Sequence, residues 1–203
     1  MEIGLAFPSP AVLEIGSRNV TGVWRSPLFP HCRSHVGFDI IDGPGVDMVG
    51  DAHHLSKYFE KNHFDFVYSM SLFEHLGFPW KVVIEMNKVM QTGGYLYIST
   101  HCAWPVHELP WDFWRYQAGA FQTMFNSFTG FEITMLAEGL PCRSYSLVDD
   151  MPTRALCFHT LNQGVAVICK KTGDYREDLL KWDVEMSDII PTMYPDHGHL
   201  NCN

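Results

Sequence analysis

The most constraining feature of this sequence is the apolar run at residues 64–71, which is followed by an acid and a histidine, Glu74 and His75. A short apolar run of this kind is typical of a β-strand that is buried on both faces. Open parallel sheets bind their ligands just beyond the carboxyl ends of the strands. We therefore expect functional residues between Ser69 and His75.

Strand and helix patterns alternate along most of the chain. The patterns predict strands at residues 11–16, 34–41, 46–49, 64–71, 95–100, 131–136 and 164–170, and helices at 55–61, 79–90, 118–128 and 174–190. This alternation predicts an α/β, Rossmann-like fold: a mostly parallel seven-stranded sheet with helices on both faces. The two closing strands predict one antiparallel strand near the C-terminus. Residues 17–33 hold too much proline and glycine for a full helix, and residues 140–160 show no clear pattern.

The composition narrows the class of protein. A length of 203 residues suits one domain, with an acidic helical extension expected at 173–203. The net charge of −9 and the lack of a basic run argue against a nucleic-acid partner. No run approaches the ~18 apolar residues of a membrane span. Six scattered cysteines and the absence of a leader pattern favour a cytoplasmic protein with reduced thiols. The sequence leaves the oligomeric state open.

Acidic residues follow the first three predicted strands. Glu14 and Gly16 end the first strand, Asp39 ends the second 23 residues after Gly16, and Asp51 ends the third. A glycine in such a turn lets a ligand approach the backbone, and an acid at this distance commonly accepts hydrogen bonds from ribose hydroxyls. A carboxylate can also accept a hydrogen bond from an adenine amino group. Each acid alone is more typical of a turn or cap residue, but acids at the ends of three consecutive strands together predict a nucleoside site.

These segments resemble the class I S-adenosylmethionine-dependent methyltransferases, and most of all the methyltransferase 11-type group, some of which are encoded with glycan-modifying enzymes. The resemblance covers residues 11–170 and rests on the order of VLEIG (12–16), GFDI (37–40), GDAHHL (50–55), FDFVYSMSLFEHL (64–76) and EMNKVMQTGGYLYIST (85–100). It implies S-adenosylmethionine as cofactor. The cofactor-binding residues that it implies are Glu14, Gly16, Asp39, Asp51, Ala52, Ser69, Met70 and Ser71.

Methyl transfer to a hydroxyl needs a group that accepts the proton, and histidine suits this role near neutral pH. His75 and His101 are the first candidates, and His107 is a third. The last two lie in HCAWPVHELPWDFWRY (101–116), in which Asp112 and Arg115 are spaced to form an ion pair. The tryptophans of this segment either line a pocket or pack the loop.

The leading interpretation is methyl transfer to a small-molecule or sugar acceptor, at oxygen. A non-catalytic methyltransferase-like binding module is the alternative, because only Glu14 and Gly16 match the usual glycine-rich loop. A nicotinamide-dependent oxidoreductase is disfavoured, because the G-x-G-x-x-G fingerprint is absent. We predict no metal ligands. Histidines beside acids occur at His53–His54 and at 196–199, but their spacing matches no standard zinc pattern.

Overall fold

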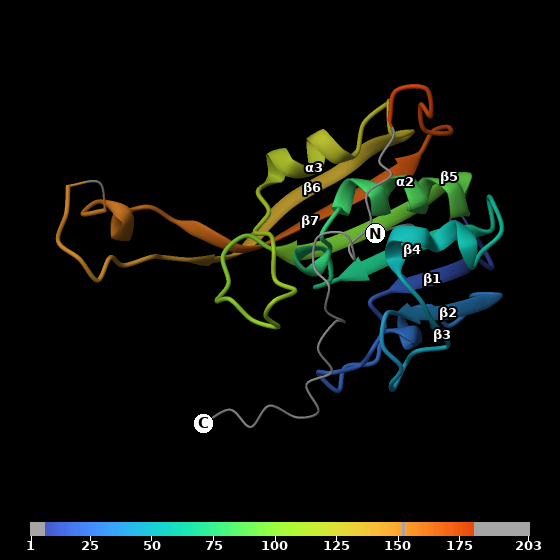
Figure 1. Cartoon of the computed structure of the whole chain (residues 1–203), viewed down its shortest axis with the longest axis horizontal. Coiled ribbons are helices and arrows are strands. Elements are labelled where there is room, and N and C mark those ends of the chain that lie inside the picture. Colours follow the sequence, from blue (N-terminus) through green and yellow to red (C-terminus); the bar gives the residue numbers. More distant parts are fainter. Residues whose placement is uncertain (1–6, 152, 181–203) are drawn as a thin grey trace.

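The computed structural model describes residues 7–151 and 153–180, which form one layered α/β unit (Figure 1). Its seven-stranded sheet has the order β3-β2-β1-β4-β5-β7-β6. The strands are β1 (Ala11–Ile15), β2 (Ser34–Asp39), β3 (Met48–Val49), β4 (Phe64–Met70), β5 (Met90–His101), β6 (Phe131–Cys142) and β7 (Leu161–Lys171). Strands β1 to β5 pair in parallel, and β7 is antiparallel to both β5 and β6. The predicted fold class is confirmed.

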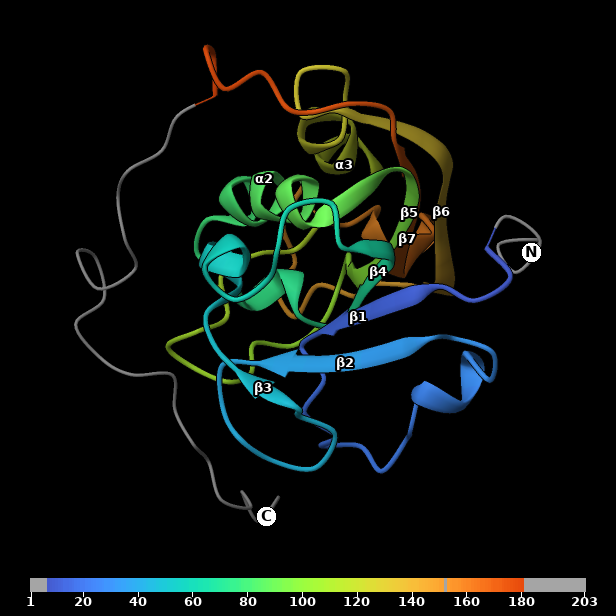
Figure 2. The same ribbon diagram turned by 90° about the vertical axis from the view of Figure 1, so that its right-hand side faces the viewer.

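Helices lie around the sheet, and the two α-helices share one face (Figure 2). The helices are α2 (Pro79–Val89), α3 (Ala118–Met124) and the short 3₁₀ helices η1 (Ser26–Leu28), η2 (Ala52–Lys57), η3 (Phe73–His75) and η4 (Leu156–Phe158). Helix α2 buries Val82 and Met86 in the main core, which also includes Leu13 and Val67 of the sheet. On the other face, Phe29 beside η1 packs against Phe66 and Tyr68.

The sequence pattern predicts α2 well because its buried stripe follows helical spacing. Val82, Val83, Met86 and Val89 are all fully buried. Complete burial of such a side chain stabilises a fold by about 1.5–3 kcal/mol. These four residues therefore attach α2 firmly to the sheet between β4 and β5. None of the helices in the described part of the chain has the length and apolar character needed to cross a membrane.

Several predicted boundaries were wrong for identifiable reasons. Helix α3 ends at Met124 rather than at residue 128. Phe125 is already extended, and the Thr129 hydroxyl donates a hydrogen bond to the Met124 carbonyl. Helix α2 ends at Val89, one residue before the predicted end, and β5 begins at once at Met90, so that it starts before the predicted residue 95. The expected helix at 55–61 is the 3₁₀ helix η2 over residues 52–57.

The C-terminal half departs further from the expectations. Strands β6 and β7 extend well beyond the predicted 131–136 and 164–170 and form a long arm that projects from the sheet (Figure 1). Many side chains along β6 are exposed, so the sequence lacks the alternation that marks a strand with one buried face. Most of the helix predicted at 174–190 lies outside the described residues, and its described part, 174–180, is not helical.

Lys171, at the end of β7, is a fully buried cation. Its Nζ donates hydrogen bonds to Asn62 Oδ1 (3.0 Å), to the Asn87 carbonyl (2.8 Å) and to the Met90 carbonyl (3.0 Å). Two of these acceptors lie at the C-terminal end of α2, where a cation also interacts favourably with the negative end of the helix dipole. Burial lowers the pKa of Lys171 below its usual value, although nearby Asp174 opposes that shift. The side chain thus joins the last strand to the end of α2.

Replacement of Lys171 by methionine should lower the free energy of unfolding by about 3–5 kcal/mol, because it leaves buried acceptors without a donor. Urea unfolding followed by circular dichroism measures this change. Lys57→Met is the matched control, because Lys57 is exposed, and it should change the free energy by less than about 0.5 kcal/mol. Equal unfolding midpoints for the two variants would contradict the structural role of Lys171.

Candidate functional site

A cavity of about 240 Å³ lies beyond the carboxyl ends of β1 to β4. Its lining includes five of the residues expected at a cofactor site and two of the three candidate histidines: Gly16, Asp39, Asp51, Ala52, Ser71, His75 and His107. These residues are far apart in the sequence. They meet because parallel strands bring their carboxyl ends to the same edge of the sheet.

Gly16 forms the floor of the cavity where β1 ends. Its φ of +79° belongs to the left-handed region, which side chains other than glycine rarely adopt. Its amide donates to the Phe38 carbonyl at 2.8 Å, which holds the turn against β2. A Cβ atom at this position would lie 3.1 Å from Cβ of Leu72. The backbone is therefore bare on the cavity side, as a closely approaching ligand requires.

Two carboxylates line the cavity beside Gly16. Asp39 accepts hydrogen bonds from the amides of Arg18 (3.0 Å) and Ile41 (3.1 Å). Asp51 is the N-cap of η2 and accepts from the amide of His53 at 2.9 Å, while its Oδ1 lies 2.7 Å from Nδ1 of the same histidine. Burial raises the pKa of Asp51, but the contacts with His53 outweigh burial and lower the pKa to about 2. Asp51 is thus a carboxylate at neutral pH.

Three residues of the expected cofactor site lie outside this cavity. Glu14 accepts a hydrogen bond from the Tyr68 hydroxyl (2.7 Å), pairs with Arg25 and lines a separate hollow. Ser69 is fully buried in β4, and its Oγ has no hydrogen-bond partner in the part of the chain that the structure describes. Met70 lines an apolar cavity on the opposite face of the sheet. Successive strand residues point to opposite faces, so the expected run Ser69–Ser71 is divided.

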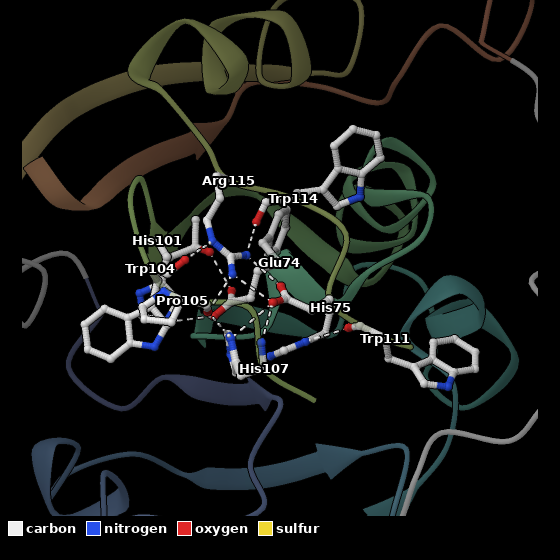
Figure 3. A network of polar contacts seen from close by, with 12 residues as sticks. Glu74, His75, His101, Trp104, Pro105, His107, Trp111, Trp114 and Arg115 are labelled. Carbon is white, nitrogen blue, oxygen red and sulfur yellow. Dashed lines mark hydrogen bonds and ion pairs between the residues drawn. The ribbon is translucent and has the colours of Figure 1, made fainter. Parts of the chain in front are cut away.

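The three candidate histidines lie in one cluster (Figure 3). The ring centroid of His107 is 4.8 Å from that of His75 and 5.9 Å from that of His101. Nδ1 of His75 lies 2.6 Å from the Trp111 carbonyl. Nδ1 of His107 lies 3.1 Å from the Pro105 carbonyl. Since a carbonyl only accepts, both contacts place the ring hydrogen on Nδ1 and leave Nε2 as the proton-accepting nitrogen.

Glu74 lies among these histidines and was not among the predicted site residues. Its side chain is fully buried, Oε2 accepts from the Thr100 hydroxyl at 2.5 Å, and Oε1 lies 3.1 Å from Nε2 of His101. Burial raises the pKa of Glu74, but the contacts with His101 and Thr100 outweigh burial, so that the pKa lies below its usual value. The sequence did show an acid just after an apolar strand, which is a signal for a functional residue. It did not show that Thr100 and His101 would contact this acid.

The loop at 101–116 covers the cluster and is held by Arg115. The guanidinium donates to both oxygens of Asp112 (2.6 and 2.7 Å) and to the carbonyls of Trp104 and Pro105 (each 2.9 Å). The predicted ion pair between Asp112 and Arg115 is confirmed. Asp112 also accepts from the His107 amide at 2.8 Å, so the ion pair fixes the position of that histidine.

The tryptophans of this loop both line the cavity and pack the loop, which were the two roles that the sequence left open. Trp111 is buried and lines the cavity, whereas Trp104 is exposed and stacks on His101 with ring centroids 4.9 Å apart. Trp114 donates from Nε1 to the Leu76 carbonyl at 2.7 Å, which ties the loop to the end of η3. Backbone strain gathers at the same place, because Ser71 and Glu108, which both line the cavity, have φ near +52° and +53°.

A family model described as a methyltransferase domain matches residues 3–140, which is more than half of the chain. The chain belongs to this methyltransferase family. The resemblance seen in the sequence is thereby confirmed at the level of the family. A search of curated proteins finds no match.

Solved structures agree with this assignment. A SAM-dependent methyltransferase from Archaeoglobus fulgidus has a TM-score of 0.57 at 17% identity, covering 80% of this chain and 86% of that one. A structure described as a putative methyltransferase from Bacillus halodurans has a TM-score of 0.62 at 15% identity, covering 85% and 96%. A putative methyltransferase from Haloferax volcanii, in complex with the activator Trm112, has a TM-score of 0.54 at 15% identity, covering 81% and 84%. At these identities, the similarity establishes the shared fold, which is that of S-adenosylmethionine-dependent methyltransferases.

Replacement of Arg115 by lysine should loosen the loop, because lysine cannot reproduce the planar fork that reaches Asp112 and two carbonyls. Since hydrogen bonds to charged groups are worth about 1.5–3 kcal/mol, amide exchange in residues 101–116 should become roughly 10–100-fold faster. Hydrogen–deuterium exchange with mass spectrometry measures this rate.

Arg154→Lys is the matched control, because Arg154 forms an exposed ion pair with Asp149 on the projecting arm. It should leave exchange in residues 101–116 unchanged. Unchanged exchange in Arg115→Lys as well would show that the guanidinium does not hold the loop.

Proposed function

We propose that this methyltransferase transfers the methyl group of S-adenosylmethionine to a hydroxyl of a small-molecule or sugar acceptor. The observation that carries the proposal is that one cavity is lined by Gly16, by the carboxylates of Asp39 and Asp51, and by His75 and His107. A nucleoside site and a proton acceptor thus adjoin each other. The family and the shared fold support S-adenosylmethionine as the cofactor.

The lining residues fit an adenosyl group chemically. A carboxylate has about four acceptor positions, and Asp39 uses two of them for backbone amides, so it can also accept from ribose hydroxyls. Asp51 is positioned by its cap role and would accept from the adenine amino group. The bare turn at Gly16 would lie against the methionine part. Phe38 and Leu72 add apolar walls to the cavity.

The size of the cavity adds an expectation about movement. At about 240 Å³ the cavity is smaller than the ~300–1,000 Å³ that is usual for small-molecule sites. Val20 also lines the cavity and is 72% exposed. An exposed side chain moves at little cost, so we expect Val20 to move aside when the cofactor binds.

The acceptor would bind on the other side of Ser71. A second hollow of about 370 Å³ lies against β5, β6 and β7, and it shares Ser71 with the first cavity. Its lining is mainly apolar, and Ser99, His101 and Glu138 are among its polar residues. Gly139 and Gly164 keep the hollow open because they carry no side chains. The polar groups in this lining would orient an acceptor hydroxyl, while its apolar part would contact the carbon skeleton of the acceptor.

S-adenosylmethionine supplies a methyl group that its sulfonium activates for transfer. The protein must align the acceptor hydroxyl and accept its proton. His75 suits the second task, because the Trp111 carbonyl holds its Nδ1 hydrogen and leaves Nε2 to accept a proton. His107 has the same arrangement through the Pro105 carbonyl. His101 lines the proposed acceptor hollow and is the third candidate.

Cofactor binding tests the first half of the proposal. Calorimetry should show one site for S-adenosylmethionine and for S-adenosylhomocysteine, and none for NAD. Asp39→Ala should weaken S-adenosylhomocysteine binding by about 10–100-fold, which corresponds to the loss of hydrogen bonds to a charged group. Asp42→Ala is the matched control, because Asp42 is exposed and near in sequence, and it should bind normally. Tighter binding of NAD than of the adenosyl ligands would contradict the proposal.

Turnover tests the second half. Release of S-adenosylhomocysteine is measured with a panel of monosaccharides and simple phenols as acceptors. His75→Gln should lower kcat by about 10²–10⁴-fold, which is typical for loss of a general base, with cofactor affinity retained. His159→Gln is the control, because His159 is exposed on the arm. Equal turnover in His75→Gln, and in the same variants of His101 and His107, would remove histidine as the base.

One observation favours the second candidate, a non-catalytic binding module. Between β1 and β2 the structure has only the 3₁₀ helix η1, so no α-helix follows the glycine turn within residues 16–33. Binding of S-adenosylhomocysteine without turnover of any acceptor in the panel would favour this candidate over the enzyme.

A further inference from the structure

Glu74, His101 and His107 bring three metal-ligating side chains to one point. Each offers one ligand atom, and these atoms all lie within 4.8 Å of one another. No other group of three such residues does so within residues 7–151 and 153–180. The three come from different elements: η3, the end of β5 and the loop that follows β5. The fold, rather than local spacing, therefore creates the cluster.

The contact between Glu74 and His101 has the distance of a hydrogen bond but lacks its direction. Nε2 of His101 lies 3.1 Å from Oε1 of Glu74, yet the buried Oε1 has no hydrogen-bond donor among the described residues. A buried carboxylate oxygen without a donor is costly. A cation between the two atoms would satisfy the buried Oε1, because a metal ion accepts electron pairs from both a carboxylate oxygen and an imidazole nitrogen.

The groups around the cluster orient the ligands as they do in metal sites. Metal-ligating histidines usually direct their other ring nitrogen to a carboxylate or a carbonyl. Nδ1 of His107 lies 3.2 Å from Asp112 and 3.1 Å from the Pro105 carbonyl, which leaves Nε2 for a metal. The Thr100 hydroxyl fixes the other oxygen of Glu74. Trp104 stacks on the His101 ring and restricts its rotation.

The charge and spacing of the cluster suit a divalent cation. The carboxylates of Glu74 and Asp112 exceed the single positive charge of Arg115, which pairs with Asp112 at 2.6 Å. Ligand atoms about 2.0–2.1 Å from a tetrahedral ion lie roughly 3.3 Å from one another. The pair Glu74–His101 already has 3.1 Å between its ligand atoms. His107 is 31% exposed at its side chain, so it has room to approach the other two.

We propose that Glu74, His101 and His107 bind one first-row divalent transition-metal ion, with Zn²⁺ as the best match. Two imidazoles and one carboxylate are a preferred ligand set for Zn²⁺, and three protein ligands leave one position open. His101 also lines the hollow proposed for the acceptor, so a bound ion could bind an acceptor hydroxyl oxygen. That role rests on the proposed function, whereas metal binding itself does not.

Metal binding to the full chain, with no methyl donor or acceptor present, tests the inference. The protein is dialysed against a chelator and titrated with ZnCl₂ in a calorimeter and with CoCl₂ in a spectrophotometer. The wild type should bind one equivalent of either ion at this site, with a visible Co²⁺ band of the intensity typical of four ligands. His101→Gln with His107→Gln should abolish the band and weaken Zn²⁺ binding at least 100-fold.

The matched control removes two imidazoles from elsewhere in the chain: His197→Gln with His199→Gln. It should bind the first equivalent as the wild type does and should keep the Co²⁺ band. Circular dichroism establishes that both double variants are folded. If the site variant is not folded, His107→Gln alone, at the most exposed ligand, serves in its place. Either no stoichiometric binding, or equal loss in the site and control variants, would overturn the proposal and leave Glu74 and His101 as an ion pair.

Discussion

The parallel pairing of β1 with β2 on one side and with β4 on the other is the constraint on which this molecule depends. The register places Ile15 opposite both Phe38 and Ser69, so that three strands end at nearly the same level. The next residues along each strand are therefore neighbours at one edge. Gly16, Asp39 and Ser71 line one cavity for this reason, although the chain separates them by tens of residues.

The buried carboxylate of Glu74 connects this edge to the rest of the site. Glu74 lies just beyond β4, and its oxygens contact Thr100 and His101 at the end of β5. Its backbone carbonyl also accepts from the amide of Phe113 at 2.8 Å, which draws the loop at 101–116 over the cavity. The same residue thus brings the histidines together and positions the loop that carries one of them. Burial of the Glu74 carboxylate lowers the stability of the fold, and burial of the apolar core around α2 offsets this loss.

The fold was largely predictable from the sequence because burial imposes local patterns. β4 is buried along its length, and α2 is buried along one stripe. Each therefore shows a regular pattern of apolar residues in the sequence. The bounds of a strand were mispredicted where its burial changes along its length. In the projecting arm, none of residues 132–142 of β6 or 161–164 of β7 is buried, so residues 140–160 lacked a readable pattern.

The site was predictable only in part. Gly16, Asp39 and Asp51 follow strands, and strand ends are visible in the sequence. Which face a side chain takes is not visible in a strand that is buried on both faces, so Met70 was grouped with Ser71 although it lines a different cavity. The cluster of Glu74 with His101 depends on pairing between strands and on Arg115 holding the loop. No local pattern encodes such contacts, so the sequence did not predict that these side chains meet.

The central claim is that a nucleoside site and a histidine cluster adjoin each other at one edge of the sheet, beside Ser71. A crystal structure of the protein with S-adenosylhomocysteine tests it most directly. We predict the ribose within hydrogen-bond distance of Asp39, the adenine beside Asp51, and the sulfur directed toward His75 and His107. Adenosyl density on the opposite face of the sheet, in the cavity beside Met70, would contradict the account.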